Sequence, residues 1–571
     1  MENLEIAKIF WEIAELLEIN NENPFKVRAY YKVAQVIEGL SESLNTIAER
    51  GELKKIPGVG EGTAEKISEL LRTGKLKYYE ELKKKIPEGL LTLLEISEIG
   101  PKTAQLLYQK LGIDNLEKLK KTLDEHKIRD LPGMGEKSED NIRRGLELLK
   151  ESGARMLLGN AFPIAEEIIE QLKKDSPVEK IEATGSLRRM KETIGDIDIL
   201  VVSKNAEKVM DVFTKLKIVR DVLAKGYTKS SILTGGGIQV DVRVVKPDEF
   251  GAALHYFTGS KAHNIAVREL GVRKGLKINE YGIFKGKKKV GGEKEEDIFD
   301  AIGLPYIPPE LRENYLEIES AKEGSLPELV GYDEIRGDLH IHSKWSDGED
   351  SIEDIASAAK ATGYEYVGIC DHSQSLKFAG GLTIVNLRKK IEEIEKLNKK
   401  IKGITILAGA EVDIKADGTL DYPDEILKEL DIVIAAVHSG FKMDQEKMTR
   451  RIIKGIENKY VHILAHPLGR LINKRDPYKV DVEHLIKTAA ETKVMLEINA
   501  HPERLDLPDI YCRRAKDQGI TIVIDTDAHH IDQMGFMKFG IGVARRGWLE
   551  KKDVLNTLPL DALLKKLKER R

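Results

Sequence analysis

The chain has little of three features that narrow the class of a protein: cysteine, long apolar runs and net charge. Its 571 residues include only 2 cysteines, Cys370 and Cys512, which excludes a disulfide framework and suits a reducing cytoplasm. There is no apolar run of about 18 residues to span a membrane, and the acidic, amphipathic start, MENLEIAKIFWEIAELL, does not resemble a signal peptide. The net charge is -4, so any nucleic-acid binding must come from local geometry rather than from bulk charge.

The chain is long enough for about three to five domains, and its patterning changes along its length. Residues 1 to about 147 are predicted to be almost wholly helical, and residues from about 155 to 315 alternate strands with helices. The polar stretch ESAKEGSLPELVGYDE, at 319–334, contains glycine and proline and indicates a linker. Short apolar strands alternate with helices after it, which predicts a parallel α/β sheet or barrel.

One pattern recurs in the helical part, at 53–67 (LKKIPGVGEGTAEKI), 93–107 (LLEISEIGPKTAQLL) and 128–142 (IRDLPGMGEKSEDNI). Each copy has an apolar residue, a tight turn with glycine and the start of a helix. Such a turn points backbone N–H groups outward and can hold a phosphate without charged side chains. A single copy would more often be a helix cap without a ligand, but three copies favour sequence-independent contacts to DNA phosphates. The arrangement resembles helix-hairpin-helix motifs.

Three aspartates form the second candidate site. Asp196 and Asp198 are two residues apart in the strand GDIDILVV, so both side chains project from one face, and Asp241 in QVDVRVV could lie beside them. Three carboxylates on one face would raise each other's pKa unless cations lie between them. Oxygen ligands suit Mg²⁺ or Mn²⁺, and two such ions support phosphoryl transfer. Solvent-facing acids on an edge strand are the alternative.

The segment before the aspartates, TGSLRR, supplies Ser186, Arg188 and Arg189, and a hydroxyl, free amides and a guanidinium are the groups that bind a polyphosphate. Together with LHYFTGSKAHNIAVRELGVRKGLKINEYG (254–282), these segments are very similar to the family X DNA polymerases, over about residues 1–315. The resemblance implies that Asp196, Asp198 and Asp241 bind two metal ions and that Asp241 helps to activate the primer 3′-hydroxyl. It implies further contacts to the incoming nucleotide, its sugar or the template from Arg155, Ser186, Arg189, Tyr256, Phe257, Gly259, Asn264 and Arg268. On physical grounds alone, Tyr256 and Phe257 could equally belong to the core.

The family also has a lyase activity that uses a lysine to form a Schiff base at an abasic site. Lys66 in AEKI matches that lysine, and Lys26 and Tyr30 in FKVRAYY match its neighbours. Gly62 stands where the family has a supporting phosphate-binding lysine, which puts this activity in doubt. A solvated lysine on a charged helix is the alternative.

Histidines and acids follow one apolar strand after another beyond residue 335. His340 and His342 alternate in DLHIHS, so both point one way. The complete set is His340, His342, Asp347, His372, Glu411, His438, His466, Asp527 and His529. In an α/β barrel the carboxyl ends of the strands meet on one face, which would bring these groups together. Imidazole with carboxylate favours Zn²⁺, Mn²⁺ or Fe, and the set is too large for one ion. Single histidines that cap strands are the alternative.

This pattern resembles the PHP (polymerase and histidinol phosphatase) domain, a distorted barrel of about seven strands, over roughly residues 335–571. The resemblance implies a site for up to three ions and the hydrolysis of phosphoesters. Our partition assigns His340, His342, Glu411 and Asp527 to one ion, with Glu411 shared. It assigns Glu411, His438 and His466 to the second ion, and Asp347, His372 and His529 to the third.

The predicted fold class is multidomain, α+β and α/β: a helical helix-hairpin-helix region, a nucleotidyltransferase palm with a thumb, and a distorted (βα)7 PHP barrel. The predicted domains are a lyase-like helical domain (1–85), a fingers-like helical domain (86–150), the palm (151–248), the thumb (249–317), a linker (318–335) and the PHP domain (336–571). The predicted protein is a cytoplasmic, monomeric DNA polymerase for gap filling in base excision repair, with 3′–5′ exonuclease activity. Its expected partners are gapped or primer–template DNA and a dNTP, without a membrane. The alternative is a DNA-end-processing phosphoesterase or small-molecule phosphatase with a structural DNA-binding half.

Overall fold

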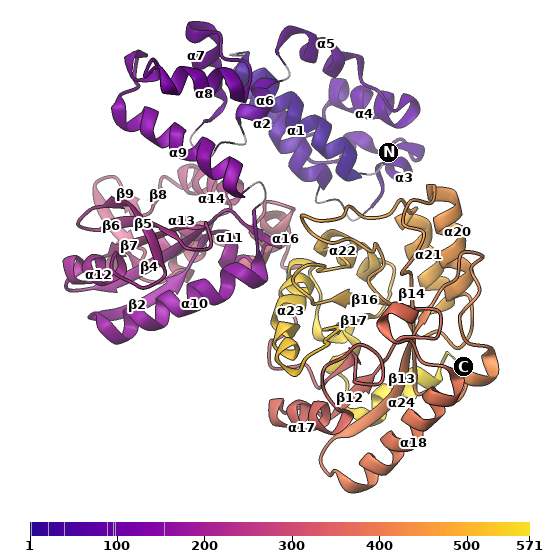
Figure 1. Ribbon diagram of the computed structural model, residues 1–571. Helices are drawn as coiled ribbons and strands as arrows, with labels where there is room; N and C mark the ends of the chain where they lie inside the picture. Colours follow the sequence, from indigo (N-terminus) through magenta and orange to yellow (C-terminus); the bar gives the residue numbers. More distant parts are fainter. Residues whose placement is uncertain are drawn as a thin grey trace.

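The structure is a computed structural model of the whole chain, and it describes residues 1–570 apart from 2, 21, 39, 41, 88, 95, 97–98 and 153–154. A helical region comes first, followed by three smaller sheets, of two, five and three strands, and then by a parallel barrel (Figure 1). In the described part of the chain, no helix is both long enough and apolar enough to cross a membrane.

The N-terminal helical region has its own apolar core, drawn from residues between Ile6 and Leu146. The predicted helical character is confirmed. Its helices are α1 (Asn3–Ile19), α2 (Pro24–Glu38), α3 (Leu44–Glu49), α4 (Glu61–Thr73), α5 (Lys77–Lys85), α6 (Gly89–Leu93), α7 (Pro101–Leu111), α8 (Leu116–Asp124) and α9 (Glu136–Ser152), with single 3-10 turns η1 (Leu53–Lys55) and η2 (Ile128–Asp130).

The three glycine turns of this region share one geometry. In each, a backbone N–H closes the turn on the carbonyl three residues earlier, from Val59 to Ile56, from Ile99 to Ile96 and from Met134 to Leu131, at 2.8–3.0 Å. Helices α4, α7 and α9 begin two residues after these donors, so the three helix starts are presented in the same way, although Pro101 at the start of α7 has no N–H to offer. Glu95, Ser97 and Glu98 of the second copy lie outside the described residues.

The palm region (residues 156–245) is built on a five-stranded sheet in the order β2-β4-β7-β6-β5. Only the central pair β4–β7 is parallel; the other neighbours are antiparallel. The elements are β1 (Met156–Leu157), α10 (Leu158–Asp175), β2 (Val178–Ala183), α11 (Gly185–Arg188), β3 (Thr193–Ile194), β4 (Asp196–Ser203), α12 (Ala206–Phe213), β5 (Val219–Lys225), β6 (Lys229–Thr234) and β7 (Gln239–Val245).

The thumb region (residues 247–323) packs helices against a three-stranded antiparallel sheet in the order β10-β9-β8. Its elements are η3 (Pro247–Glu249), α13 (Phe250–Thr258), α14 (Lys261–Arg273), β8 (Lys277–Asn279), β9 (Gly282–Lys285), β10 (Lys288–Gly291), α15 (Glu296–Ile302), η4 (Pro309–Leu311) and α16 (Glu317–Glu323).

The stretch predicted as a linker is more ordered than expected. Its first part is helix α16, and Ile318 and Ala321, one helical turn apart, are buried in the thumb core. Val330 is fully buried, and its N–H donates to the Leu549 carbonyl at 3.0 Å. The glycine and proline signals marked turns correctly, but the apolar side chains between them attach this segment to its neighbours.

The barrel (residues 337–568) is a parallel sheet in the sequential order β11-β12-β13-β14-β15-β16-β17, as predicted. The strands are β11 (Gly337–Ile341), β12 (Tyr366–Ile369), β13 (Thr405–Asp413), β14 (Ile432–Ala436), β15 (Ile463–Leu464), β16 (Met495–Asn499) and β17 (Ile522–Asp525). The helices and 3-10 turns are α17 (Ile352–Thr362), η5 (Lys377–Ala379), α18 (Ile384–Lys400), α19 (Asp424–Leu427), α20 (Gln445–Ile456), α21 (Val482–Thr492), α22 (Asp509–Asp517), η6 (Ile531–Phe536), α23 (Met537–Arg546), η7 (Lys551–Asp553), η8 (Leu555–Thr557) and α24 (Leu560–Lys568).

Side chains complete the seam between β11 and β17. The backbone pairs there only at Ile341 and Ala528, and the Asp525 carboxylate accepts from the Leu339 N–H at 2.8 Å. At the amino-terminal end of β11, the Asn556 amide donates to the Gly337 carbonyl at 2.9 Å and to the Ile524 carbonyl. These side chains satisfy backbone groups that the two strands do not pair with each other.

The palm region and the barrel share one continuous apolar core. Phe162 of α10 meets Phe539 of α23 with ring centroids 5.7 Å apart. Gly159 faces Pro502 so closely that a Cβ would lie 2.4 Å from that ring. Because Pro502 follows β16 and α23 follows β17, the palm region docks beside the carboxyl ends of these strands.

Candidate functional site

The three palm aspartates meet as predicted. In the parallel β4–β7 pair, Asp198 lies directly opposite Asp241, and Asp196 is two residues away on the same face. Burial and the nearby carboxylates of Asp196 and Asp241 raise the pKa of Asp198 to about 7. The pKa of Asp196 is raised for the same reasons. Cations between these groups would remove the repulsion, so the carboxylates fit the predicted Mg²⁺ or Mn²⁺ ions.

Two neighbours of the aspartates were not found from the sequence. Lys229, on β6, places its Nζ 2.6 Å from an Asp241 carboxylate oxygen, and the Gln239 amide donates to the other oxygen at 2.9 Å. No motif marks Lys229, because it reaches Asp241 only through the β6–β7 pairing.

The TGSLRR turn lies against the aspartates. Gly185 has φ +63°, and a Cβ there would be 3.0 Å from an Asp198 carboxylate oxygen, so only glycine fits this close approach. It brings the following residue, Ser186, to the edge of the acidic face. Arg155 approaches from the other side: its guanidinium donates to Thr193, and burial lowers its pKa although Asp196 opposes this.

The last turn of α13, the glycine that follows it and the start of α14 lie beside Arg189. A Cβ on Gly259 would lie 3.1 Å from the Arg189 guanidinium. The Tyr256 and Phe257 rings pack edge to face with centroids 5.1 Å apart. The Asn264 amide donates to the Tyr256 carbonyl at 2.7 Å, while its own oxygen is buried without a hydrogen-bond partner. The Arg268 Nε donates to the Asn264 carbonyl at 3.3 Å.

Arg189 is held by a buried chain of charges that reaches the barrel. Its Nε donates to a Glu313 carboxylate oxygen at 3.0 Å, and Arg546 of α23 donates to the same oxygen at 3.0 Å. Arg546 also donates to Asp509 at 2.7 Å and to the Arg189 carbonyl at 3.0 Å. Despite its burial, the cations of Lys191, Arg546 and Arg189 hold the pKa of Glu313 at about 2.

Replacement of Arg546 by methionine is expected to destabilise the protein. The change removes one of the cations that compensate the buried Glu313, and breaking such a pair costs about 3–5 kcal/mol. The midpoint of urea unfolding should fall clearly. The matched control is Arg388→Met, because Arg388 pairs with Glu429 at the exposed surface, where water screens the charges. An unchanged midpoint for Arg546→Met would contradict a stabilising role for this buried chain.

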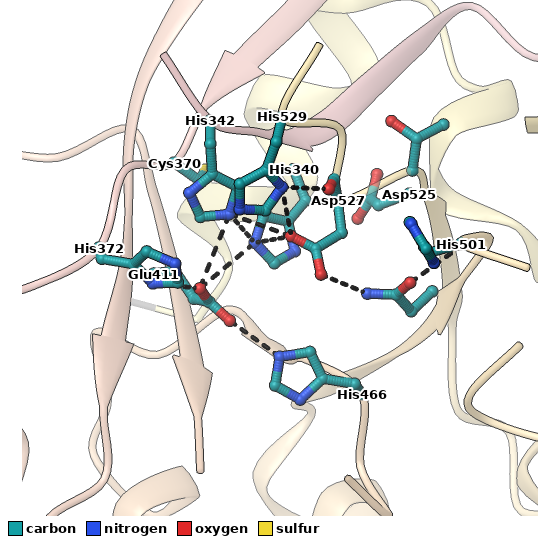
Figure 2. Close-up of polar contacts among 12 residues, drawn as sticks. His340, His342, Cys370, His372, Glu411, His466, His501, Asp525, Asp527 and His529 are labelled. Carbon is teal, nitrogen blue, oxygen red and sulfur yellow. Dashed lines mark hydrogen bonds and ion pairs between the residues drawn. The ribbon is translucent and has the colours of Figure 1, made fainter. Parts of the chain in front are cut away.

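The predicted metal ligands of the barrel converge at the carboxyl ends of its strands. Glu411 contacts several imidazoles. One of its carboxylate oxygens lies 2.9 Å from His466 Nε2 (Figure 2) and 3.2 Å from His438 Nε2. The other lies 2.7 Å from His372 Nδ1 and 3.7 Å from His340 Nε2. Glu411 therefore faces several imidazoles at once, as expected of a bridging ligand.

Three groups of side chains are close enough to hold an ion among the described residues. They are His340, His342 and Asp527; His372, Glu411 and His438; and His342, Asp347, His372 and His529. Compared with our partition, Glu411 is absent from the first group, His372 stands in place of His466 in the second, and His342 joins the third. Two imidazoles, those of His342 and His372, lie between neighbouring acids. His342 places Nε2 3.0 Å from Asp527 and Nδ1 3.7 Å from Asp347. His372 similarly lies between Glu411 and Asp347.

The charges of this cluster indicate positions for cations. Burial would lower the pKa of His372, but Glu411 and Asp347 raise it to about 10. Burial would also lower the pKa of His438, but Glu411 and Asp413 raise it to about 9. Burial and the neighbouring His372 lower the pKa of His342 to about 4, which leaves it a neutral imidazole. This set of donors fits Zn²⁺, Mn²⁺ or Fe.

Further carboxylates behind the ligands orient the imidazoles. The pair His340 Nδ1–Glu497 is 2.6 Å apart, and the pair His438 Nδ1–Asp413 is 2.7 Å apart. Such contacts hold a ligating imidazole in one orientation. Glu497 and Asp413 were not predicted. Glu497 lies within the apolar strand β16 and Asp413 at the end of β13, and an acid at such a buried position could have indicated a functional contact.

Lys66 lies in the N-terminal helical region, away from both sites. Its Nζ donates to the Gly62 carbonyl at 2.9 Å and lies 5.1 Å from the centre of the Tyr78 ring. Lys26 faces the same ring at 5.8 Å, and Tyr30 stacks on it at 6.1 Å. The predicted neighbours of Lys66 are therefore present, and they are joined by Tyr78, which the sequence did not indicate.

Comparison with known proteins agrees with this architecture. Family models match for a helix-hairpin-helix domain (residues 1–76), a SAM-like helix-hairpin-helix tandem (90–147), a DNA polymerase beta thumb (253–313) and a PHP domain (338–501). The chain is 40% identical to "DNA polymerase/3'-5' exonuclease PolX" of Bacillus subtilis, over 99% of this chain and 100% of the relative. The chain belongs to the family X DNA polymerases that carry a C-terminal PHP domain.

Other relatives match only one half of this family X chain. DNA polymerase lambda of Arabidopsis thaliana is 26% identical over 54% of the chain and 62% of the relative. A probable phosphatase of Thermoanaerobacter sp. is 31% identical over 38% of the chain and 89% of the relative.

Proposed function

We propose that this protein is a template-directed DNA polymerase that fills gaps during base excision repair and removes nucleotides from DNA 3′ ends. The proposal rests on two clusters in one chain: three aspartates on one face of the palm sheet, and a set of imidazoles and carboxylates at the strand ends of the barrel. The similarity to PolX of Bacillus subtilis extends over both halves and supports the same pairing of activities.

Nucleotide addition is assigned to the palm region. Asp196, Asp198 and Asp241 would hold two Mg²⁺ or Mn²⁺ ions, which when bound stabilise the charge on a transferring phosphoryl group. Asp241 would help to accept the proton of the primer 3′-hydroxyl. We assign Ser186 and Arg189 to the triphosphate: Ser186 follows Gly185, which lies against Asp198, and the Glu313 carboxylate fixes the Arg189 guanidinium.

The remaining predicted contacts surround the nucleotide. Arg155 lies close enough to Asp196 to influence its charge, and we assign it to the triphosphate. Tyr256, Phe257 and Gly259 would contact the sugar and discourage a 2′-hydroxyl. Asn264, whose buried oxygen lacks a hydrogen-bond partner, would face the minor-groove edge of the base. Arg268, one helical turn later, would contact the template strand.

Hydrolysis is assigned to the barrel. The imidazoles and carboxylates would hold up to three Zn²⁺, Mn²⁺ or Fe ions, which supply Lewis acidity for phosphoester cleavage. Glu497 and Asp413 would keep the imidazoles of His340 and His438 in position. The three glycine turns of the helical region would hold DNA by its phosphates. We further propose the domain limits 1–85, 86–150, 151–248, 249–317 and 336–571, a monomeric state and a reducing cytoplasm as the location.

One assay with a gapped duplex tests both activities. The primer carries a 5′ label, and the protein is given Mg²⁺ or Mn²⁺ with or without dNTPs. Template-directed lengthening with dNTPs and stepwise shortening without them are expected. If the primer were shortened but never lengthened, the protein would be a DNA-end-processing phosphoesterase and not a polymerase. Hydrolysis of phosphorylated metabolites but not of DNA would favour the small-molecule phosphatase alternative.

Lyase activity of the N-terminal helical region gives a separate prediction. If Lys66 forms a Schiff base, borohydride should trap the protein on 5′-incised abasic DNA, and Lys66→Ala should reduce trapping at least about tenfold, since the nucleophile is lost. The control is Lys54→Ala, because Lys54 is exposed and pairs with Glu61. Equal trapping of the two variants would show that Lys66 is not the nucleophile.

A further inference from the structure

The loop that follows β12 exposes a phenylalanine. Phe378 lies in the turn η5, and 88% of its surface is accessible. Its neighbours Leu376 and Ala379 are buried, with only 6% and 5% of their surface accessible. These two residues anchor the turn, and Phe378 and Lys377 point outward. A single exposed apolar residue is common on protein surfaces, so the position of this one decides its meaning.

The loop is fastened to the residues that frame the barrel site. The Ser375 hydroxyl donates to Asp413 at 2.7 Å, and Asp413 also holds His438. The Leu382 N–H donates to the carbonyl of His372 at 2.9 Å. These contacts fix both ends of the loop to ligand-bearing strand ends, so the tip is presented on a rigid support.

The tip stands at the open side of the site. Asp347 and His529 have 32% and 33% of their side chains exposed, whereas the other imidazoles and acids of the cluster are exposed by 13% or less. The backbone of Gly380 lies against Ser346, whose carbonyl would be 3.2 Å from a Cβ on that glycine. Since Ser346 precedes Asp347, the η5 turn that carries Phe378 lies next to the loop that carries this exposed ligand. Lys344 and Lys377 are exposed on the same two loops.

We propose that Phe378 is a stacking position for an unpaired base of the DNA strand whose 3′ end is cut at the barrel site. This inference rests on the proposed exonuclease function. An aromatic face accepts any base, and the two lysines suit the adjoining phosphates, as in other proteins that bind single strands without sequence preference. Phe378 would hold the frayed end in register for successive cuts.

The test uses the full-length protein with its metals and two single-stranded oligonucleotides. One has normal bases throughout, and the other has tetrahydrofuran abasic residues at its last three positions. Phe378→Ala should lower kcat/KM about tenfold on the normal strand, mainly through KM, and change it less than about twofold on the abasic strand, which has no base to stack. Phe378→Trp should retain the wild-type rates. Tyr227→Ala, which removes an aromatic ring that is 70% exposed in the palm region, is the matched control.

Each outcome separates stacking from its alternatives. Wild-type rates for Phe378→Ala on the normal strand would overturn the proposal. An equal loss on both strands would also overturn it, because a structural or backbone role does not depend on the base. Metal content and thermal unfolding of each variant identify a folding defect. If the wild type cut neither strand, the exonuclease function itself would fail, and the stacking position with it.

Discussion

Replacement of both Asp196 and Asp198 by alanine is expected to abolish nucleotide addition, with a loss of at least about 1,000-fold. The two carboxylates and Asp241 share one face across the parallel β4–β7 pair, and no other acid of the described sheet pairs with this position. Removing two of the three ligands leaves only Asp241, and one carboxylate is too few to hold the two ions that neutralise the transferring phosphoryl group. Primer extension on the gapped duplex measures this directly.

The same variant should keep its fold and its hydrolysis. Because Asp196, Asp198 and Asp241 repel each other and the pKa of Asp198 is raised, their removal should leave the thermal stability of the metal-free protein unchanged or higher. Shortening of a DNA 3′ end should stay within about twofold, because the barrel ligands are untouched. Extension that survives the double replacement would refute the assignment of the palm site.

The control for this variant removes two acids from the same region. Asp211 on α12 and Asp221 on β5 are exposed and pair with Lys225 and Arg220. The double variant Asp211→Ala/Asp221→Ala changes the net charge equally, and it should extend the primer at the wild-type rate. This separates a lost ligand from a changed surface charge.

Replacement of His340 and His342 by alanine is expected to remove bound transition metal and hydrolysis together. His340 lies within 3.7 Å of both Glu411 and Asp527, and His342 lies between Asp527 and Asp347. Their loss affects two of the three ligand groups, so 3′-end shortening should fall by at least about 1,000-fold. Elemental analysis of the purified protein and shortening of a labelled strand are the measurements.

Nucleotide addition by this variant reports on its folding. The palm region shares an apolar core with the barrel, so extension at near the wild-type rate would show that the barrel still supports it. His484→Ala is the control, because His484 is exposed on α21, outside the ligand groups. Hydrolysis that persists after the metal is lost would exclude a metal-dependent barrel site.

Local periodicity made much of the architecture predictable. A spacing of two on a strand places Asp196 with Asp198, and His340 with His342, on one face whatever surrounds them. The repeated glycine turns and the strand–helix alternation likewise depend on short-range backbone geometry. The linker was less predictable, because glycine and proline mark turns but do not report whether the residues between them are buried.

The sequence by itself determined which kinds of side chain each candidate site contains, because residue type and spacing along single strands are local properties. Only the tertiary structure decided how they meet: the register that sets Asp241 opposite Asp198, the approach of Lys229, and the sharing of His342 and His372 between ligand groups. It also decided that Arg546 of the barrel reaches Glu313 and Arg189. Contacts between distant segments depend on strand pairing and on packing between regions, and neither leaves a periodic signal in the chain.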